Sequence, residues 1–166
     1  MRQAILAVGV LFLALGHPVA AAAECTDPPR PDVDWSRCIH DRREMRQADL
    51  TGALLRDTSF LRAQLDGTVF TRADAYNVSF VSASLVKAVF DDSRLQRADF
   101  TRADLRGASF LQADLRRARF FRANLRGADL SGAQLAGADL LNADLTGATW
   151  VDGKTICRDE SIGSCR

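Results

Sequence analysis

Histidine and a recurring aspartate are the residue types in this sequence that could perform acid–base or nucleophilic chemistry. His40 lies in a charged segment, outside the region where serine and aspartate recur, so a Ser–His–Asp triad is not favoured. The aspartates each precede a leucine or phenylalanine at a fixed spacing, where aspartate typically binds turn N–H groups. They are Asp99, Asp104, Asp114, Asp129, Asp139 and Asp144. We therefore expect these aspartates to stabilise turns, and we expect no enzyme activity. We also expect no cofactor, since no phosphate-loop pattern surrounds the glycines.

The N-terminal segment, residues 1–23, has the pattern of a secretory signal peptide. Arg2 provides a positive charge, an apolar run covers residues 4–15, and small residues at the end of the segment provide a cleavage site. The apolar run is too short to span a bilayer, which disfavours a membrane anchor. Lipid attachment at Cys25 is disfavoured because the bulky, acidic Glu24 precedes it. We expect an exported protein, periplasmic or secreted, without a membrane span.

Four cysteines lie in two close pairs, Cys25 with Cys38 and Cys157 with Cys165, one at each end of the chain that would remain after export. An even number of cysteines in an oxidising compartment favours disulfides, with three connectivities open. We favour local pairing, because a rigid rod between the pairs would hold them apart. A zinc site is the weaker alternative, since no CxxC motif occurs and His40 is the one histidine outside the signal peptide. We expect no metal.

A five-residue repeat covers residues 46–150 without an insertion. Positions whose numbers divide by five are Leu or Phe, apart from Ala75 and Trp150, and a small residue stands two places earlier. On an α-helix, residues five apart rotate by about 140°, so the apolar side chains would spiral around every face. On a flat strand, an odd period places successive apolar residues on opposite faces. A backbone that turns a corner after each unit points all of them inward, and four corners close a square coil.

The units MRQADL, TRADL, RANL, GADL, NADL and GATW resemble the pentapeptide-repeat family, whose consensus is A(D/N)LXX. The resemblance covers 21 consecutive units, and the flanks VDWSRC and GATWVDGKTICRDESIGSC are similar to those of exported bacterial members. It implies an all-β fold, a right-handed quadrilateral β-helix, here with about five coils capped at both ends. We expect an N-terminal cap at residues 24–45 and a C-terminal cap at residues 151–166, where Trp150 would close the tube.

If four units form one coil, residues twenty apart stack on each other. This predicts two phenylalanine stacks on opposite faces: Phe70, Phe90 and Phe110 in one, and Phe60, Phe80, Phe100 and Phe120 in the other. Ala75 interrupts a leucine column between them. We expect Val78 to fill the space; a bulge that turns Tyr76 inward and a small pocket are the alternatives.

Charge is balanced overall but segregated along the chain. Without the signal peptide, 21 Lys and Arg balance 21 Asp and Glu, which argues against nucleic acid as a partner. Residues 94–126 carry nine arginines and three aspartates, whereas residues 127–152 carry four aspartates and no basic residue. Two interpretations are open. The arginines bind an anionic ligand, such as a polysaccharide, a lipid head group or an acidic protein, or they pair with aspartates of neighbouring coils.

Positions directly after the inward residues point outward, and one column of them is largely apolar. Aligned exposed apolar residues mark interaction surfaces. We expect a candidate interaction surface formed by this column and nearby arginines: Leu61, Val81, Phe121, Leu141, Arg97, Arg102, Arg116, Arg117, Arg119 and Arg122. The expected function is that of an exported, non-catalytic scaffold or protein-interaction module that binds a protein partner or itself. The family resemblance also implies DNA mimicry, which some members use to protect topoisomerases, but a neutral, exported chain disfavours it.

Overall fold

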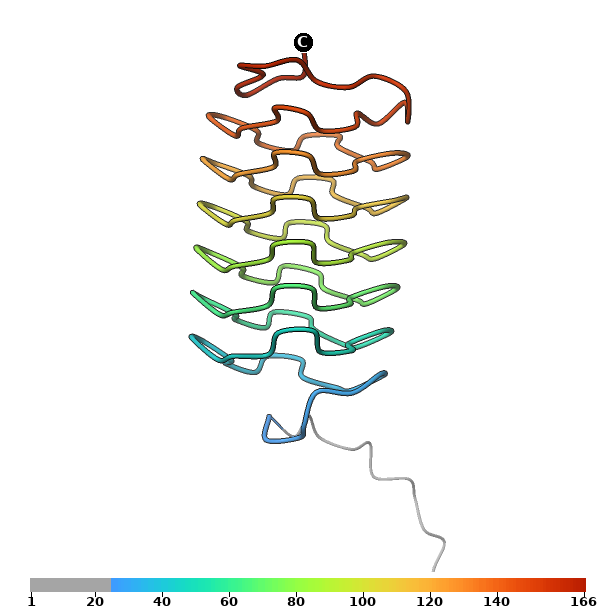
Figure 1. The fold of residues 1–166 in the computed structure, drawn as a ribbon. Helices are drawn as coiled ribbons and strands as arrows, with labels where there is room; N and C mark the ends of the chain where they lie inside the picture. Colours follow the sequence, from blue (N-terminus) through green and yellow to red (C-terminus); the bar gives the residue numbers. More distant parts are fainter. Residues whose placement is uncertain (1–24) are drawn as a thin grey trace, which may run out of the picture.

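The computed structural model describes residues 25–166, and the expected signal peptide lies outside this range. The chain winds into stacked square coils that form a rod, with the N-terminal coil at the bottom of Figure 1 and the C-terminal segment at the top. Single-residue parallel bridges join residues twenty apart, from Asp34 with Leu54 to Asp129 with Thr149. Residues 31–150 therefore form six coils, each contributing one bridge residue per side. The expected quadrilateral β-helix is confirmed.

The first coil begins at residue 31, fifteen residues before the recognisable repeat. Trp35, His40 and Met45 occupy inward positions there, and all three are buried. Asp34 already forms the bridge of a regular side. Most of the segment expected to be an N-terminal cap, residues 24–45, is thus part of the solenoid, because an inward position accepts any large side chain that fills the tube.

Each corner of a coil is a four-residue turn closed by one hydrogen bond. The N–H of Cys38, for example, donates to the carbonyl of Trp35 at 3.0 Å. The second corner residue has a positive φ, whether it is glycine or not: 58° at Arg62 and 65° at Gly107. A positive φ at this position is the pattern of a type II turn. A residue other than glycine pays about 1–2 kcal/mol for the left-handed conformation.

Backbone hydrogen bonds join each side of a coil to the coils before and after it. The N–H of Phe80 donates to the carbonyl of Asp99 at 2.8 Å, and the N–H of Asp99 donates back to the carbonyl of Val78 at 2.9 Å. This exchange recurs along every side of the prism. It satisfies backbone groups that would otherwise be buried without partners.

Stacked aromatic rings fill the tube, as expected. Phe70 and Phe90 lie 4.8 Å apart between ring centroids and within 3° of parallel, and Phe100 and Phe120 lie 5.0 Å apart in the opposite stack. Rings of the two stacks meet edge to face, for example at 5.6 Å between Phe80 and Phe90. Offset-parallel and edge-to-face contacts are both favourable for aromatic rings.

The five-residue register continues through Ala75 without a bulge. Asp74 bridges to both Leu54 and Arg94, and Ala75 is completely buried. Tyr76 lines a groove on the surface, so the alternative of a bulge that turns Tyr76 inward is wrong. Val78 is also buried, and its filling of the space beside Ala75 stays a prediction.

A disulfide is present near each end of the rod, with the local pairing expected. Cys25 bonds to Cys38, thirteen residues away, and Cys157 bonds to Cys165, eight residues away. The C-terminal segment, residues 151–166, folds back on the last coil through antiparallel bridges from Ile156 to Thr149 and from Ile162 to Asp144. The partly buried Trp150 packs against the core.

Candidate interaction surface

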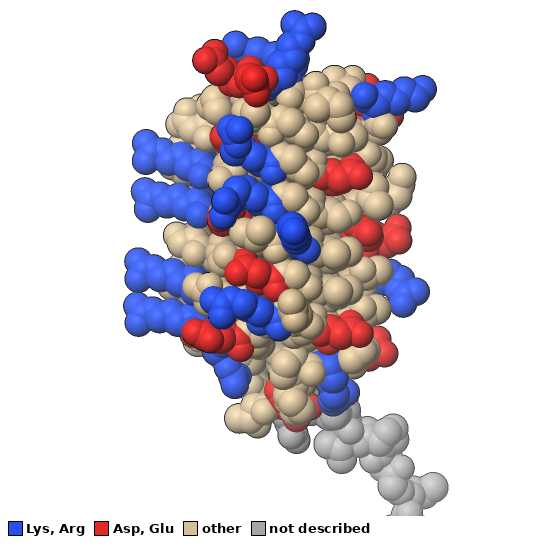
Figure 2. Space-filling view, viewed as in Figure 1, with Lys and Arg blue, Asp and Glu red and all other residues tan. Residues whose placement is uncertain are grey.

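One side of the rod, which we call the arginine face, carries arginines along both of its edges. Its inward side chains are His40, Phe60, Phe80, Phe100, Phe120 and Leu140. One edge is the corner column Arg37, Asp57, Asn77, Arg97, Arg117 and Gly137. The other edge is the corner column Arg42, Arg62, Ser82, Arg102, Arg122 and Asn142. Basic side chains project in a row from one edge of the prism in Figure 2.

The interpretation that the arginines pair with aspartates holds for part of the arginine-rich region, residues 94–126, both between neighbouring coils and within a coil. Five of its nine arginines pair with aspartates: Arg94, Arg106, Arg116, Arg119 and Arg126. The other four are Arg97, Arg102, Arg117 and Arg122, and within residues 25–166 none of them forms a salt bridge. These four, all exposed, occupy the second corner position in the fourth and fifth coils, two on each edge of the arginine face.

The four unpaired arginines sit in a backbone conformation that favours glycine. Their φ angles lie between 57° and 61°. Another corner of the prism uses glycine at the equivalent position in most coils, at Gly67, Gly107, Gly127 and Gly147. Arginine at this position adopts the less favourable left-handed backbone conformation, although its side chain makes no ion pair in the described part of the protein. Its guanidinium group remains available for a ligand.

The expected apolar column lies beside the second of these arginine edges. Leu61, Val81 and Phe121 are half-buried, and Leu141 is 60% exposed. The guanidinium of Arg122 lies 5.1 Å from the centroid of the Phe121 ring, within the range of a cation–π contact. Apolar and cationic side chains are therefore neighbours on this edge at Leu61 with Arg62 and at Phe121 with Arg122.

The structure brings most of the sequence-predicted surface residues together on the arginine face. Leu61, Val81, Phe121, Leu141, Arg102 and Arg122 follow one edge, and Arg97 and Arg117 follow the other. Arg119 lies between the two edges and pairs with Asp99 at 3.4 Å. Arg116 is the exception, because its side chain pairs with Asp114 on the neighbouring side of the prism. The hydrogen bond from Arg116 is the main cause that lowers the pKa of the Asp114 carboxyl.

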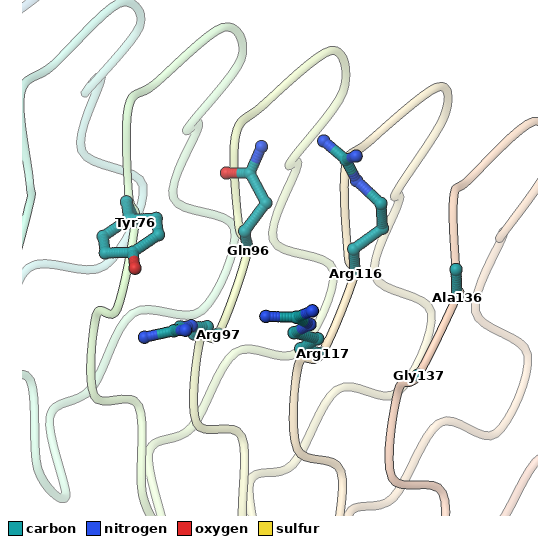
Figure 3. Close-up of a pocket in the computed structure, with 7 residues that line it drawn as sticks. All are labelled: Tyr76, Gln96, Arg97, Arg116, Arg117, Ala136 and Gly137. Atoms are coloured by element: carbon teal, nitrogen blue, oxygen red, sulfur yellow. The ribbon is translucent and has the colours of Figure 1, made fainter.

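A groove of about 540 Å³ runs along the corner that bears Arg97 and Arg117, and its lining includes two residues missed by the sequence analysis, Tyr76 and Gln96. In Figure 3, Tyr76, Gln96 and Arg116 follow one another along one column, with Arg97 and Arg117 beside them. A second groove, of about 470 Å³, lies on the arginine face and shares Arg97 and Arg117 with the first. The twenty-residue spacing from Tyr76 to Gln96 is the sequence signal that could have identified this site.

His40 has no access to a substrate. It is completely buried, its ring centroid lies 4.2 Å from that of Trp35, and the Arg43 guanidinium donates to Nδ1 at 3.2 Å. Burial, and then the charge of Arg43, lower the pKa of His40 to about 4. Residues 25–166 contain no cluster of three or more potential metal ligands. They also contain no helix of the length and hydropathy that a membrane crossing requires.

The fold and surface define a class of protein: a β-solenoid that presents flat outer faces built from a short repeat. The chain belongs to the pentapeptide-repeat family. The family model described as a pentapeptide repeat region matches residues 43–120, and a model of pentapeptide repeats in eight copies matches residues 113–149.

Two solved structures illustrate the similarity. HetL, a pentapeptide-repeat protein involved in the regulation of heterocyst differentiation in the cyanobacterium Nostoc sp. strain PCC 7120, is 31% identical, with a TM-score of 0.52 over 76% of this chain and 73% of HetL. A trypsin-treated variant of QnrB1, a plasmid-mediated fluoroquinolone resistance protein, is 22% identical, with a TM-score of 0.61 over 71% of this chain and 60% of QnrB1. The latter likeness concerns the fold alone. No curated protein sequence matches the chain. The fold is therefore the right-handed quadrilateral β-helix of this family.

Proposed function

We propose that this protein is an exported, non-catalytic interaction module that binds a protein partner, or a second copy of itself, through the edge that bears Phe121. The observation that carries the proposal is the apolar column from Leu61 to Leu141 beside unpaired arginines. Aromatic residues and arginine are enriched in protein interfaces, and lysine is depleted. The regular backbone supports a preformed surface, which lowers the cost of ordering side chains on binding.

Replacement of Phe121 by aspartate tests this proposal. The variant places a carboxylate in the apolar column, so we expect it to lose crosslinked partners that the wild-type protein recovers from the exported fraction. Leu111→Asp is the matched control: Leu111 is 37% exposed and occupies the same corner position on the opposite edge of the prism. Recovery of the same proteins by all three forms would reject the edge as an interface.

Self-association and export need their own measurements. Light scattering of the purified protein distinguishes a dimer from a monomer, and Phe121→Asp should dissociate a dimer held by this edge. Intact mass of the protein recovered outside the cytoplasm tests export, and we expect a chain that begins between Ala22 and Glu24. A mature protein that retains residues 1–23 would contradict the signal peptide.

Binding of an anionic ligand by the arginine-rich middle coils is the second candidate function. It is supported by the four arginines that lack a carboxylate partner in the described part of the chain. Binding to a soluble polyanion should weaken steeply as salt concentration rises. The same arginines disfavour mimicry of DNA, because a DNA mimic presents an anionic surface.

A further inference from the structure

We propose that the groove between Tyr76 and Arg117 binds a linear anionic oligosaccharide that carries carboxylate or sulfate groups. The inference rests on the second candidate function and narrows it to one site and one class of ligand. It depends on the charge of the groove, on its shape and on the tyrosine that lines it.

The charge of the groove is carried by two like-charged neighbours. Arg97 and Arg117 lie in adjacent coils, one directly above the other, so their backbones are about 4.8 Å apart. Neither guanidinium forms a salt bridge within residues 25–166. The nearby carboxylate of Asp114 is already engaged by Arg116 and by Gln96, whose Nε2 donates to it at 2.6 Å. An anion placed between Arg97 and Arg117 would relieve their mutual repulsion and accept charge-assisted hydrogen bonds.

The shape of the site favours an elongated ligand. Grooves of about 540 Å³ and about 470 Å³ lie on the two sides of the Arg97–Arg117 pair, so a chain can run along either side of it. Ala136 and Gly137 line the far part of the first groove, where short side chains leave it open. The edge that bears Arg102 and Arg122 has neither of these two grooves.

Tyr76 gives the groove a hydroxyl that can contact a sugar. It is the one tyrosine of the chain, and its ring centroid lies 4.9 Å from the guanidinium carbon of Arg56 and 5.9 Å from that of Arg97. In Figure 3 its hydroxyl is turned toward the column of Arg97 and Arg117. Because guanidinium groups lie over the ring, the phenolic hydroxyl is the part of Tyr76 that can bind the polar groups of a sugar.

Calorimetric titration of the mature protein tests the site with two probes, hexagalacturonate for carboxylates and sulfated maltohexaose for sulfates. Neutral maltohexaose is the uncharged control. We expect at least one charged probe to bind, and the double variant Arg97→Gln/Arg117→Gln to weaken that binding about tenfold or more. Tyr76→Ala should weaken it severalfold. The matched control is Arg42→Gln/Arg62→Gln, which removes the same charge from two adjacent coils of the arginine face outside the middle coils and should change the affinity by less than about twofold.

The outcomes separate this inference from the function on which it rests. Equal weakening by both double variants would show that the arginine face binds anions without using the groove, which overturns the site and leaves the second candidate function standing. Binding of hexaglutamate as tightly as the sugars, or of phosphatidylglycerol vesicles instead of them, would overturn the ligand class. Failure of all these probes at millimolar concentration would overturn both the inference and the second candidate function.

Discussion

His40 stacks on Phe60 with ring centroids 5.5 Å apart and 23° between the ring planes. The histidine therefore continues the stack of Phe60, Phe80, Phe100 and Phe120 into the first coil. Trp35 also packs against the imidazole, at 4.2 Å between centroids and with a tilt of 48° between the rings. A titratable group thus occupies the end of an otherwise apolar column, and protonation would place a charge there.

Stability should fall as the pH is lowered from 6.5 toward 4 because of His40. Burial lowers the pKa of His40 to about 4 in the folded protein, so between these values the unfolded chain binds more protons. The contribution is fully present above pH 6.5 and is lost as the pH falls, at no more than about 1.4 kcal/mol per pH unit. Urea denaturation at pH 7 and pH 5 should show a smaller difference for His40→Phe than for the wild type. An equal difference in both proteins would assign the pH dependence to other groups.

Phe90→Ala should destabilise the protein by about 3–5 kcal/mol, because a large buried side chain is replaced by a cavity. Phe90 contacts Phe70 and Phe110 within its own stack, at 4.8 and 5.0 Å. The comparison is Phe121→Ala, which removes the same side chain from the surface and should cost less than about 1 kcal/mol. Urea denaturation measures both. Similar losses for the two variants would contradict the aromatic stacks.

Gly127→Ala should destabilise the protein by about 1–2 kcal/mol through backbone strain alone. Gly127 has a φ of 66°, and a Cβ built there meets no atom within 4 Å. Arg62→Gly is the reverse substitution at an equivalent corner with a φ of 58°, and it should not reduce stability, since glycine removes the strain. Thermal denaturation compares the two, and a stabilised Gly127→Ala protein would show that the corner is not left-handed in solution.

Loss of the C-terminal disulfide should lower the unfolding free energy by about 2–3 kcal/mol in the chain-entropy model. Cys157 is buried beneath the end of the rod, and its N–H donates to the carbonyl of Ala148 at 2.8 Å. Cys157→Ser/Cys165→Ser should therefore release residues 151–166 first, detectable as faster amide exchange in the last coil. The Cys25–Cys38 pair serves as the internal comparison, because its loss should affect the first coil instead. Equally fast amide exchange along the whole rod in either variant would show that the disulfide does not stabilise its own end of the rod specifically.

Most of the architecture follows from the five-residue period. Each inward position lies next to positions twenty residues away, so the sequence alone places Phe70 under Phe90. It also favoured local pairing of the cysteines, without excluding the other connectivities. The start of the first coil was not predictable in this way. Trp35, His40 and Met45 keep the spacing but lack the consensus letters, because the tube requires volume at these positions and tolerates different chemistry.

The candidate surface was only partly predictable. Sequence spacing located the apolar column of Leu61 and Phe121, since it depends on the same period. The separation of paired from unpaired arginines depends on where each side chain turns at its corner. Arg126 reaches Asp144, eighteen residues away, at 3.1 Å, whereas Arg97 and Arg117 reach no carboxylate in the described part of the chain.

The sequence by itself determined the square coil and the aromatic stacks, because these depend on a period that each coil repeats. The connectivity of the four cysteines became definite only in the structure. Tertiary structure alone decided which arginines pair with aspartates and where the grooves lie. The groove brings Tyr76, Arg97 and Arg117 together from three successive coils, and its openness depends on short side chains at Ala136 and Gly137. Side-chain direction and packing between columns set these features, and no single repeat unit encodes them.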